Sequence, residues 1–209
     1  MAILKDGSFY EYSKLIGVDL ETYSPVDPPW KKCADPIVGI SFAVMDNISI
    51  NSGLFVISMI QPTDREQLLL RQSISILESL NGARVWFYGY GDGRFDVPYM
   101  LARARIYGLE DRLKRAIESA SNLDVYDLMK GILGKNNLSL KRCEETLGIE
   151  RVLPKSRING ANYHYYYDLW KRSGSCQALL YNIEDAIIPL LIFQKLKWLL
   201  KKRQVRFQL

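Results

Sequence analysis

The stretch LIGVDLE, residues 15–21, is a short apolar run that carries two acidic residues. Its β-branched and aliphatic residues, bounded by polar segments, predict a β-strand. Side chains two positions apart on a strand point to the same face, so Asp19 and Glu21 share one face. Val18 and Leu20 then turn into the core. Two carboxylates on a buried strand are costly unless they bind something, whereas an edge strand with a solvated face would leave them without a function.

The segments that follow this strand indicate an α/β fold. A proline-rich loop comes first, and then PIVGISFAV (36–44) and NISI (47–50) predict the two strands of a β-hairpin. Thr63 and Glu66 have the spacing of a capping box, in which the two side chains cap the N-terminus of a helix. The apolar periodicity predicts that this helix ends near residue 80.

The second half of the chain adds two strands and several helices. RVWFY (84–88) predicts a strand, and LDVYDLM (123–129) predicts a short strand that continues as a helix. The remaining helix limits are indicated by Pro98, Gly108, Ser139, Gly148 and the Ser173-Gly174 break. This order predicts an α/β fold with a mixed β-sheet flanked by helices. We expect residues 1–209 to form a single domain, with a basic C-terminal helical extension from about residue 195.

The composition is that of a globular protein with one unusual segment. The chain has 209 residues, of which 48% are hydrophobic, and a net charge of +5 from 28 basic and 23 acidic residues. Six basic residues and no acidic residue lie between Lys195 and Arg206. A basic tail on a nearly neutral body suits a polyanion partner. Cations that complement the end of a helix dipole would give the same pattern.

The chain lacks the patterns of a secreted or membrane protein. MAILKDGSFYEY, at its start, has neither the basic flank nor the apolar run of a signal peptide. The apolar run from Ala186 to Phe193 is far shorter than the roughly 20 residues of a membrane span. Cys33, Cys143 and Cys176 show neither metal-type spacing nor a disulfide framework. We therefore expect a cytoplasmic protein with no membrane partner.

A further acidic candidate, Asp96, follows a predicted strand and a turn that is rich in glycine. It precedes Pro98, so it should lie at the exit of the strand or at the N-cap of the next helix. A plain N-cap aspartate is the alternative to a functional role. The glycines of the turn, Gly89, Gly91 and Gly93, allow another chain to approach the backbone closely.

Tyr181 and Asp185 are four residues apart on a predicted helix, so they share one face. A hydrogen-bonded pair in the core is the alternative interpretation. If these elements meet at a common centre, Asp19, Glu21, Asp96 and Asp185 would repel each other unless cations lie among them. Hard carboxylate oxygens suit Mg²⁺ or Mn²⁺. The acids therefore predict a two-metal site for phosphoryl transfer.

The order of these residues carries a family resemblance. The motifs Asp-x-Glu, aromatic-Asp and Tyr-x-x-x-Asp occur in this order at residues 19–21, 95–96 and 181–185. The chain resembles the DnaQ-like 3′–5′ exonucleases of the DEDDy type, which have a ribonuclease-H-like fold. Residues 15–195 also resemble the predicted exonucleases of the ribonuclease-H-like superfamily. The related histidine subtype is excluded, because it needs a histidine where this chain has Leu180.

This resemblance implies a role for each of the five residues. Asp19, Glu21 and Asp185 would hold one of two Mg²⁺ or Mn²⁺ ions. Asp19 would also contact the second ion, with Asp96 acting directly or through water. Tyr181 would orient the attacking water. The substrate would be the 3′ end of a nucleic acid, with single-stranded DNA or RNA favoured, and the product would be a nucleoside monophosphate. The oligomeric state stays open.

Substrate contacts are expected from two loops. Trp30, Lys31 and Lys32 follow the first predicted strand, and an aromatic ring with adjacent cations could stack a base and hold phosphate. A tryptophan that packs against its own loop is the alternative. Gly91 and Arg94, before the second motif, are further candidates. Relatives often carry asparagine at the position of Gly91, and this departure affects how the substrate would be handled.

Two other functions fit the same residues. The first is a non-catalytic nucleic-acid-binding module that retains the fold. Intact acids and the tyrosine argue against it, because a purely structural protein gains nothing from clustered carboxylates. The second is a structure-specific endonuclease that uses the same metals. Substrates with blocked and free 3′ ends distinguish an endonuclease from an exonuclease.

Overall fold

The computed structural model describes residues 13–25, 33–46, 53–91, 93–134, 138–151 and 158–206, with side chains up to residue 199. Its centre is a five-stranded sheet in the order β3-β2-β1-β4-β5. The first three strands pair antiparallel, whereas β1, β4 and β5 pair parallel, so the predicted mixed sheet is confirmed. The strands are β1 (Lys14–Thr22), β2 (Ile37–Asp46), β3 (Leu54–Ile60), β4 (Ala83–Trp86) and β5 (Asn122–Asp124).

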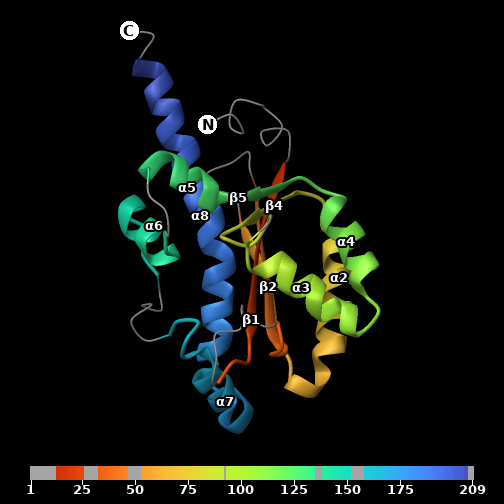
Figure 1. Ribbon diagram of the computed structural model, residues 1–209. Coiled ribbons are helices and arrows are strands. Elements are labelled where there is room, and N and C mark those ends of the chain that lie inside the picture. Colours follow the sequence, from red (N-terminus) through yellow and green to blue (C-terminus); the bar gives the residue numbers. More distant parts are fainter. Residues whose placement is uncertain are drawn as a thin grey trace.

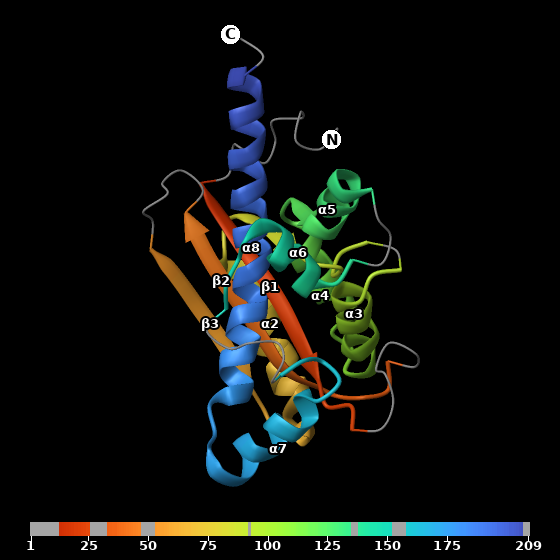
Figure 2. The ribbon, with the colours of Figure 1, turned by 90° about the vertical axis from the view of Figure 1, so that its left-hand side faces the viewer.

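Helices cover both faces of this sheet, as Figure 1 shows. One face carries α2, α3 and α4, while α8 crosses the other face along β1 and β2 with α5 and α6 nearby (Figure 2). The helices are α2 (Glu66–Ser79), α3 (Asp96–Ile106), α4 (Glu110–Glu118), α5 (Val125–Leu133), α6 (Leu140–Leu147), α7 (Tyr163–Ser173) and α8 (Gln177–Arg206). The prediction of an α/β fold with flanking helices is therefore confirmed.

The alternation of side chains along β1 divides the core into two layers. Ile16, Val18 and Leu20 are buried in the cluster that includes α2 and α3. Leu15 is buried in the cluster on the other face, which includes α8. The acidic residues of β1 follow the register of Leu15, so they turn toward α8. The sequence pattern predicted this division correctly.

Two glycines let α8 lie directly against the sheet. A Cβ at Gly17 of β1 would collide with the backbone carbonyl of Ala186. A Cβ at Gly39 of β2 would collide with the side chain of Asn182. The sheet thus offers α8 a surface without side chains at both positions, and the helix approaches more closely than a larger residue would allow.

Several predicted helix limits are confirmed by their local geometry. The Ser139 hydroxyl accepts a hydrogen bond from the Arg142 backbone N–H at 3.2 Å, as an N-cap does. Gly148 and Gly174 end α6 and α7 in the left-handed conformation, with φ of 61° and 71°. LDVYDLM forms β5 and the start of α5, as its composition predicted.

The predicted hairpin is wrong in the position of its turn. The partner of β2 is β3, which begins at Leu54, whereas NISI at 47–50 lies outside the described residues. β2 itself runs through Met45 and Asp46, which were expected in the turn. Turn-type residues at 46–47 favoured an early turn, but pairing with β1 and β3 keeps residues 45 and 46 extended.

The predicted capping box is also wrong. Thr63–Arg65 forms a short 3₁₀ turn and α2 begins at Glu66, and neither element has a side-chain cap hydrogen bond. The Glu66 carboxylate turns inward instead, where it accepts a hydrogen bond from the Ile37 backbone N–H at 2.7 Å. A hydrogen bond to a distant segment thus replaces the expected hydrogen bond at the start of the helix.

Helix α4 was not predicted, although it separates α3 from β5.

Helix α8 is 30 residues long, and Figure 1 shows that its C-terminal end extends beyond the sheet. The basic extension predicted from about residue 195 is continuous with this helix, although its side chains beyond residue 199 lie outside the description. Within the described part of the chain, no helix combines the length and the apolar character needed to cross a bilayer.

Candidate metal centre

Three carboxylates meet where α8 crosses β1. One carboxylate oxygen each from Asp19, Glu21 and Asp185 lies within 4.8 Å of the other two. Glu21 and Asp185 are buried and Asp19 is half-buried. Two of the residues come from β1 and one from α8, so the cluster forms only when the helix packs on the sheet. Like charges this close are unfavourable in a protein interior, and a bound cation would relieve the repulsion.

The surroundings of the cluster explain how the fold forms it. β2 places Ser41 and Gly39 opposite Asp19 and Glu21. These small residues leave the surface of the sheet open for α8. Gly17, two residues before Asp19, is in contact with the α8 backbone at Ala186, the neighbour of Asp185. Close packing at the glycines therefore fixes the distance between the acids of the strand and the acid of the helix.

Asp96 lies at the N-terminus of α3 and is 6% exposed. It is the first residue of the helix rather than its N-cap, and the N-cap position belongs to Phe95. Burial raises the pKa of Asp96 well above its usual value, and the negative charges of Asp124 and Asp185 raise it further. The influence of Asp185 on this pKa shows that the two carboxyl groups lie within electrostatic reach of each other.

The glycine-rich turn packs against Asp96. A Cβ at Gly89 would collide with the Asp96 carboxylate, so the backbone passes directly beside this side chain. The Gly89 carbonyl also accepts a hydrogen bond from the Val97 backbone N–H at 2.8 Å. The close approach predicted for these glycines thus occurs at Gly89. The group that approaches is the carboxylate of Asp96, in the same protein chain.

Tyr181 lies one helical turn before Asp185 and is 4% exposed. Burial raises the pKa of Tyr181 well above its usual value, and the charge of Asp185 and a hydrogen bond to it act in the same direction. Glu21 and Asp19 add to this shift. The phenol therefore stays protonated, and it lies close enough to three of the predicted site residues for their charges to affect it.

Comparison of the sequence with models of known protein families identifies the family of this chain. A family model described as RNase H superfamily matches residues 18–196. The chain belongs to the RNase H superfamily. No curated protein matches the chain significantly. The fold is accordingly a ribonuclease-H-like α/β fold. Membership in this superfamily implies a nucleic-acid substrate and suggests nuclease activity with divalent metal ions, and the carboxylate cluster offers suitable ligands.

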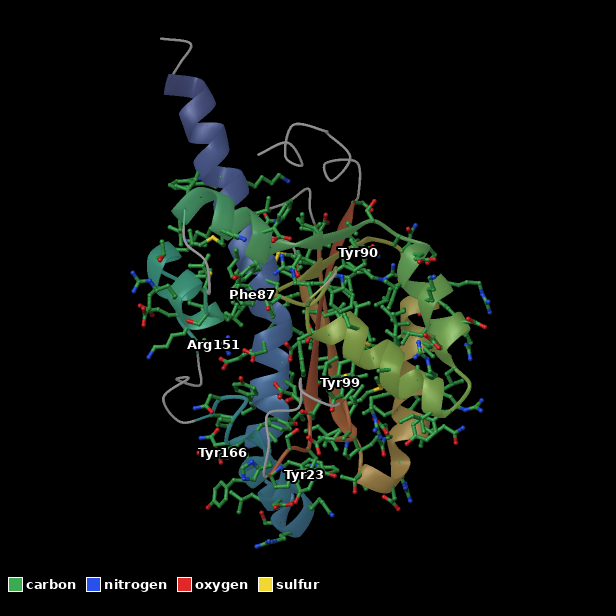
Figure 3. All side chains as sticks on the ribbon, in the orientation of Figure 1. Tyr23, Phe87, Tyr90, Tyr99, Arg151 and Tyr166 are labelled. Atoms are coloured by element: carbon green, nitrogen blue, oxygen red, sulfur yellow. The ribbon has the colours of Figure 1, made fainter. Side chains whose placement is uncertain are left out.

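One residue of this RNase H superfamily member was missed by the sequence analysis. Arg151 follows α6, and its guanidinium contacts Asp185 Oδ1 through Nη1 at 2.5 Å. The same guanidinium contacts Glu144 Oε1 through Nη2 at 2.6 Å. Figure 3 shows Arg151 beside α8. The sequence has no local signal for this contact, because 34 positions separate residues 151 and 185.

Asp124 is a second missed residue, and it fixes the turn beside Asp96. Its carboxylate accepts hydrogen bonds from the backbone N–H groups of Tyr88, Gly89 and Tyr90 at 2.9, 2.9 and 3.0 Å. It also caps α5 through the Tyr126 N–H. Burial raises the pKa of Asp124, while these hydrogen bonds lower it. An aspartate directly before a predicted helix was the available signal, since it is a common N-cap.

Of the five predicted substrate contacts, the structure describes two, Gly91 and Arg94. Trp30, Lys31 and Lys32 lie outside the described residues. Gly91 has a φ of 115°, a backbone conformation in which a residue with a side chain would be strained. Arg94 contacts Asp127 and stacks over two tyrosine rings, with distances from its guanidinium carbon of 5.0 and 4.8 Å. Its substrate role stays a prediction.

Proposed function

We propose that this RNase H superfamily member is a divalent-metal-dependent 3′–5′ exonuclease of the DEDDy type. The observation that carries the proposal is the cluster of Asp19, Glu21 and Asp185 within 4.8 Å, with the buried Tyr181 hydrogen-bonded to Asp185. The charge of Asp185 also acts on the buried Asp96. The acids of the first and third DEDDy motifs thus come from distant segments of the chain and meet in one cluster. The proposal treats residues 1–209 as one exonuclease domain.

The donor set suits two Mg²⁺ or Mn²⁺ ions. All the candidate ligands are carboxylate oxygens, which these hard cations prefer. Asp19, Glu21 and Asp185 would hold one ion, and Asp19 together with Asp96 would hold the other. When bound, the ions would stabilise the attacking and leaving oxygens of an in-line displacement at phosphorus. Glu21, Asp96 and Asp185 are buried, and this supports the fit, because acids that bind no cation would be costly there.

Tyr181 has a defined task in this scheme. Its single O–H is hydrogen-bonded to the Asp185 carboxylate, so the phenol oxygen can accept a hydrogen bond from the attacking water and orient it. Because the phenol stays protonated, it does not take the proton of that water. In the reaction, a water oxygen bonds to phosphorus and the bond between phosphorus and the 3′ oxygen of the preceding nucleotide breaks. The products are a nucleoside 5′-monophosphate and a strand shortened by one residue with a free 3′ hydroxyl.

A single-stranded 3′ end is the favoured substrate. The terminal phosphodiester must reach carboxylates that lie between the sheet and α8, so a duplex would have to separate at its end. That separation costs stacking energy, which a single strand does not have to lose. Lys31, Lys32 and Arg94 are the proposed phosphate contacts, and Trp30 the proposed stacking partner.

A gel assay tests the proposal directly. DNA and RNA oligomers with a 5′ label are incubated with Mg²⁺, Mn²⁺ or EDTA, and Asp19→Asn serves as the variant. A metal-dependent ladder that shortens from the 3′ end, and that is absent with the variant, supports the exonuclease. Cleavage of oligomers with a blocked 3′ end would instead identify an endonuclease. Intact oligomers that shift on a native gel would identify a non-catalytic binding module.

A further inference from the structure

Arg151 is a buried cation at the edge of the proposed metal site. Its side chain is 3% exposed, and the side chains of its two partners, Glu144 and Asp185, are each 7% exposed. The partners come from different helices, Glu144 from α6 and Asp185 from α8. The guanidinium therefore bridges two elements and reaches a carboxylate that belongs to the metal cluster.

The guanidinium of Arg151 stays charged although it is buried. Burial alone would lower the pKa of Arg151, but the charges of Asp185 and Glu144 raise it above its usual value. A guanidinium presents its donors in a rigid planar fork, so it holds carboxylates in a defined geometry. Because Arg151 is almost completely buried, it acts on the site through Asp185 rather than through contact with a substrate phosphate.

We propose that Arg151 is a positioning residue that fixes the Asp185 carboxylate in the orientation in which it binds a divalent cation. The inference rests on the proposed metal site and assigns a further residue to it. The Tyr181 hydroxyl is hydrogen-bonded to the Asp185 carboxylate from the same helix, and the Arg151 guanidinium, from the segment after α6, forms an ion pair with it at 2.5 Å. Partners that orient a ligating carboxylate contribute strongly to metal affinity.

Glu144 explains why a cation can be tolerated beside a cation-binding site. A lone arginine at this distance would repel a divalent ion. The Glu144 carboxylate carries the opposite charge and contacts the same guanidinium at 2.6 Å, so the pair has no net charge. What the pair then contributes is the orientation of Asp185.

The test removes the pair without changing the net charge. In the double variant Glu144→Met/Arg151→Met, apolar side chains of similar length replace the buried ion pair, a replacement that proteins often tolerate. The dissociation constant for Mn²⁺ is measured by calorimetry on the folded protein without substrate. We expect it to rise about 10- to 100-fold. An unchanged or smaller constant in the double variant would overturn the inference.

A matched control isolates the position of the pair. Arg112 and Glu78 form an ion pair at 2.6 Å between α4 and α2, with both side chains 40% exposed. The variant Glu78→Met/Arg112→Met makes the same change in composition on the other side of the sheet. It should bind Mn²⁺ as the parent does. An equal loss in this control would show a general effect of the substitutions and would overturn the assignment to Arg151.

A second variant keeps the test decisive if the double variant fails to fold. Arg151→Lys retains the charge but lacks the planar fork, and we expect Mn²⁺ affinity about 10-fold below that of the parent. Parent-like affinity in this variant would overturn the inference. If the parent binds Mn²⁺ and Asp19→Asn does not, the metal site stands whatever the result at Arg151. A parent that binds no Mn²⁺ would overturn both proposals.

Discussion

The two faces of the sheet bury carboxylates in opposite ways. On the face that carries α2 and α3, Glu66 is 1% exposed and is surrounded by donors. Arg103 contacts it through Nε at 2.8 Å and through Nη2 at 2.5 Å, and the Tyr107 hydroxyl donates to it at 2.7 Å. With the Ile37 N–H, four donor groups face one carboxylate. This acid is neutralised entirely by the protein.

On the face that carries α8, carboxylates lie beside other carboxylates. Asp19, Glu21 and Asp185 come within 4.8 Å, and the charge of Arg151 is shared with Glu144. Donors around Glu66 stabilise the fold, whereas the acids on the α8 side form a site that a cation would complete. The contrast separates an acid whose charge is balanced by the protein from acids that we propose bind a cation, which burial alone does not distinguish.

The largest expected effect is on activity, at Asp19. Asp19→Asn removes one ligand charge and keeps the shape of the side chain. Metal-dependent nuclease activity should fall by at least about 100-fold, since even partners that only orient ligands contribute up to that factor. In EDTA the melting temperature should equal or exceed that of the parent, because one repelling charge is gone. A stable variant with the activity of the parent would refute the metal site.

At Glu66 the same type of substitution should have the reverse consequence. Glu66→Gln leaves the buried Arg103 guanidinium without its counterion, and we expect a loss of about 3–5 kcal/mol in the free energy of unfolding. Urea denaturation measures this loss. Activity per folded molecule should stay close to that of the parent. If Glu66→Gln were neutral in stability and Asp19→Asn strongly destabilising, the roles assigned to the two faces would be exchanged.

Metal ions should stabilise the protein by binding only on the face of the sheet that carries α8. At a Mn²⁺ concentration 100 times the dissociation constant, binding adds about 2.7 kcal/mol to the free energy of unfolding. Thermal melts with Mn²⁺ and with EDTA should show this rise for the parent and for Glu66→Gln. The rise should be absent from Asp19→Asn. A rise of the same size in all three proteins would place the bound ion elsewhere.

The sequence predicted the α8 side of the sheet better than the side of Glu66. Alternation in LIGVDLE correctly predicted which face of β1 carries Asp19 and Glu21, and helical spacing correctly predicted that Tyr181 and Asp185 are neighbours. Both predictions rest on periodic patterns, and in a regular strand or helix the period fixes which side chains share a face. Glu66 fits a local capping pattern equally well, but its partner Arg103, 37 residues later, decides its orientation.

Contacts between distant segments mark the limit of what the pattern could predict. Arg151 and Asp185 have no periodic relation, so their contact depends on how α6 and the segment after it pack on α8. The hairpin turn was predicted too early, because turn-type residues inside the pairing region of β2 resemble a hairpin turn. The sequence also could not predict the role of Gly17. A glycine in a strand indicates that another element packs closely on the strand, but it does not indicate which element.

The smallest expected effect tests that close approach. Gly17→Ala places a methyl group against the Ala186 carbonyl, so α8 must shift or the strand must bend. We expect a loss of about 1–3 kcal/mol in the free energy of unfolding, as is usual for overpacked cores. Because Asp185 directly precedes Ala186 on α8, Mn²⁺ affinity should fall as well. Gly131→Ala in α5 is the matched control. The Cβ at residue 131 has open space around it, so neither the free energy of unfolding nor the Mn²⁺ affinity should fall.

If Gly17→Ala loses stability but binds Mn²⁺ as the parent does, the spacing between β1 and α8 does not set the geometry of the metal centre.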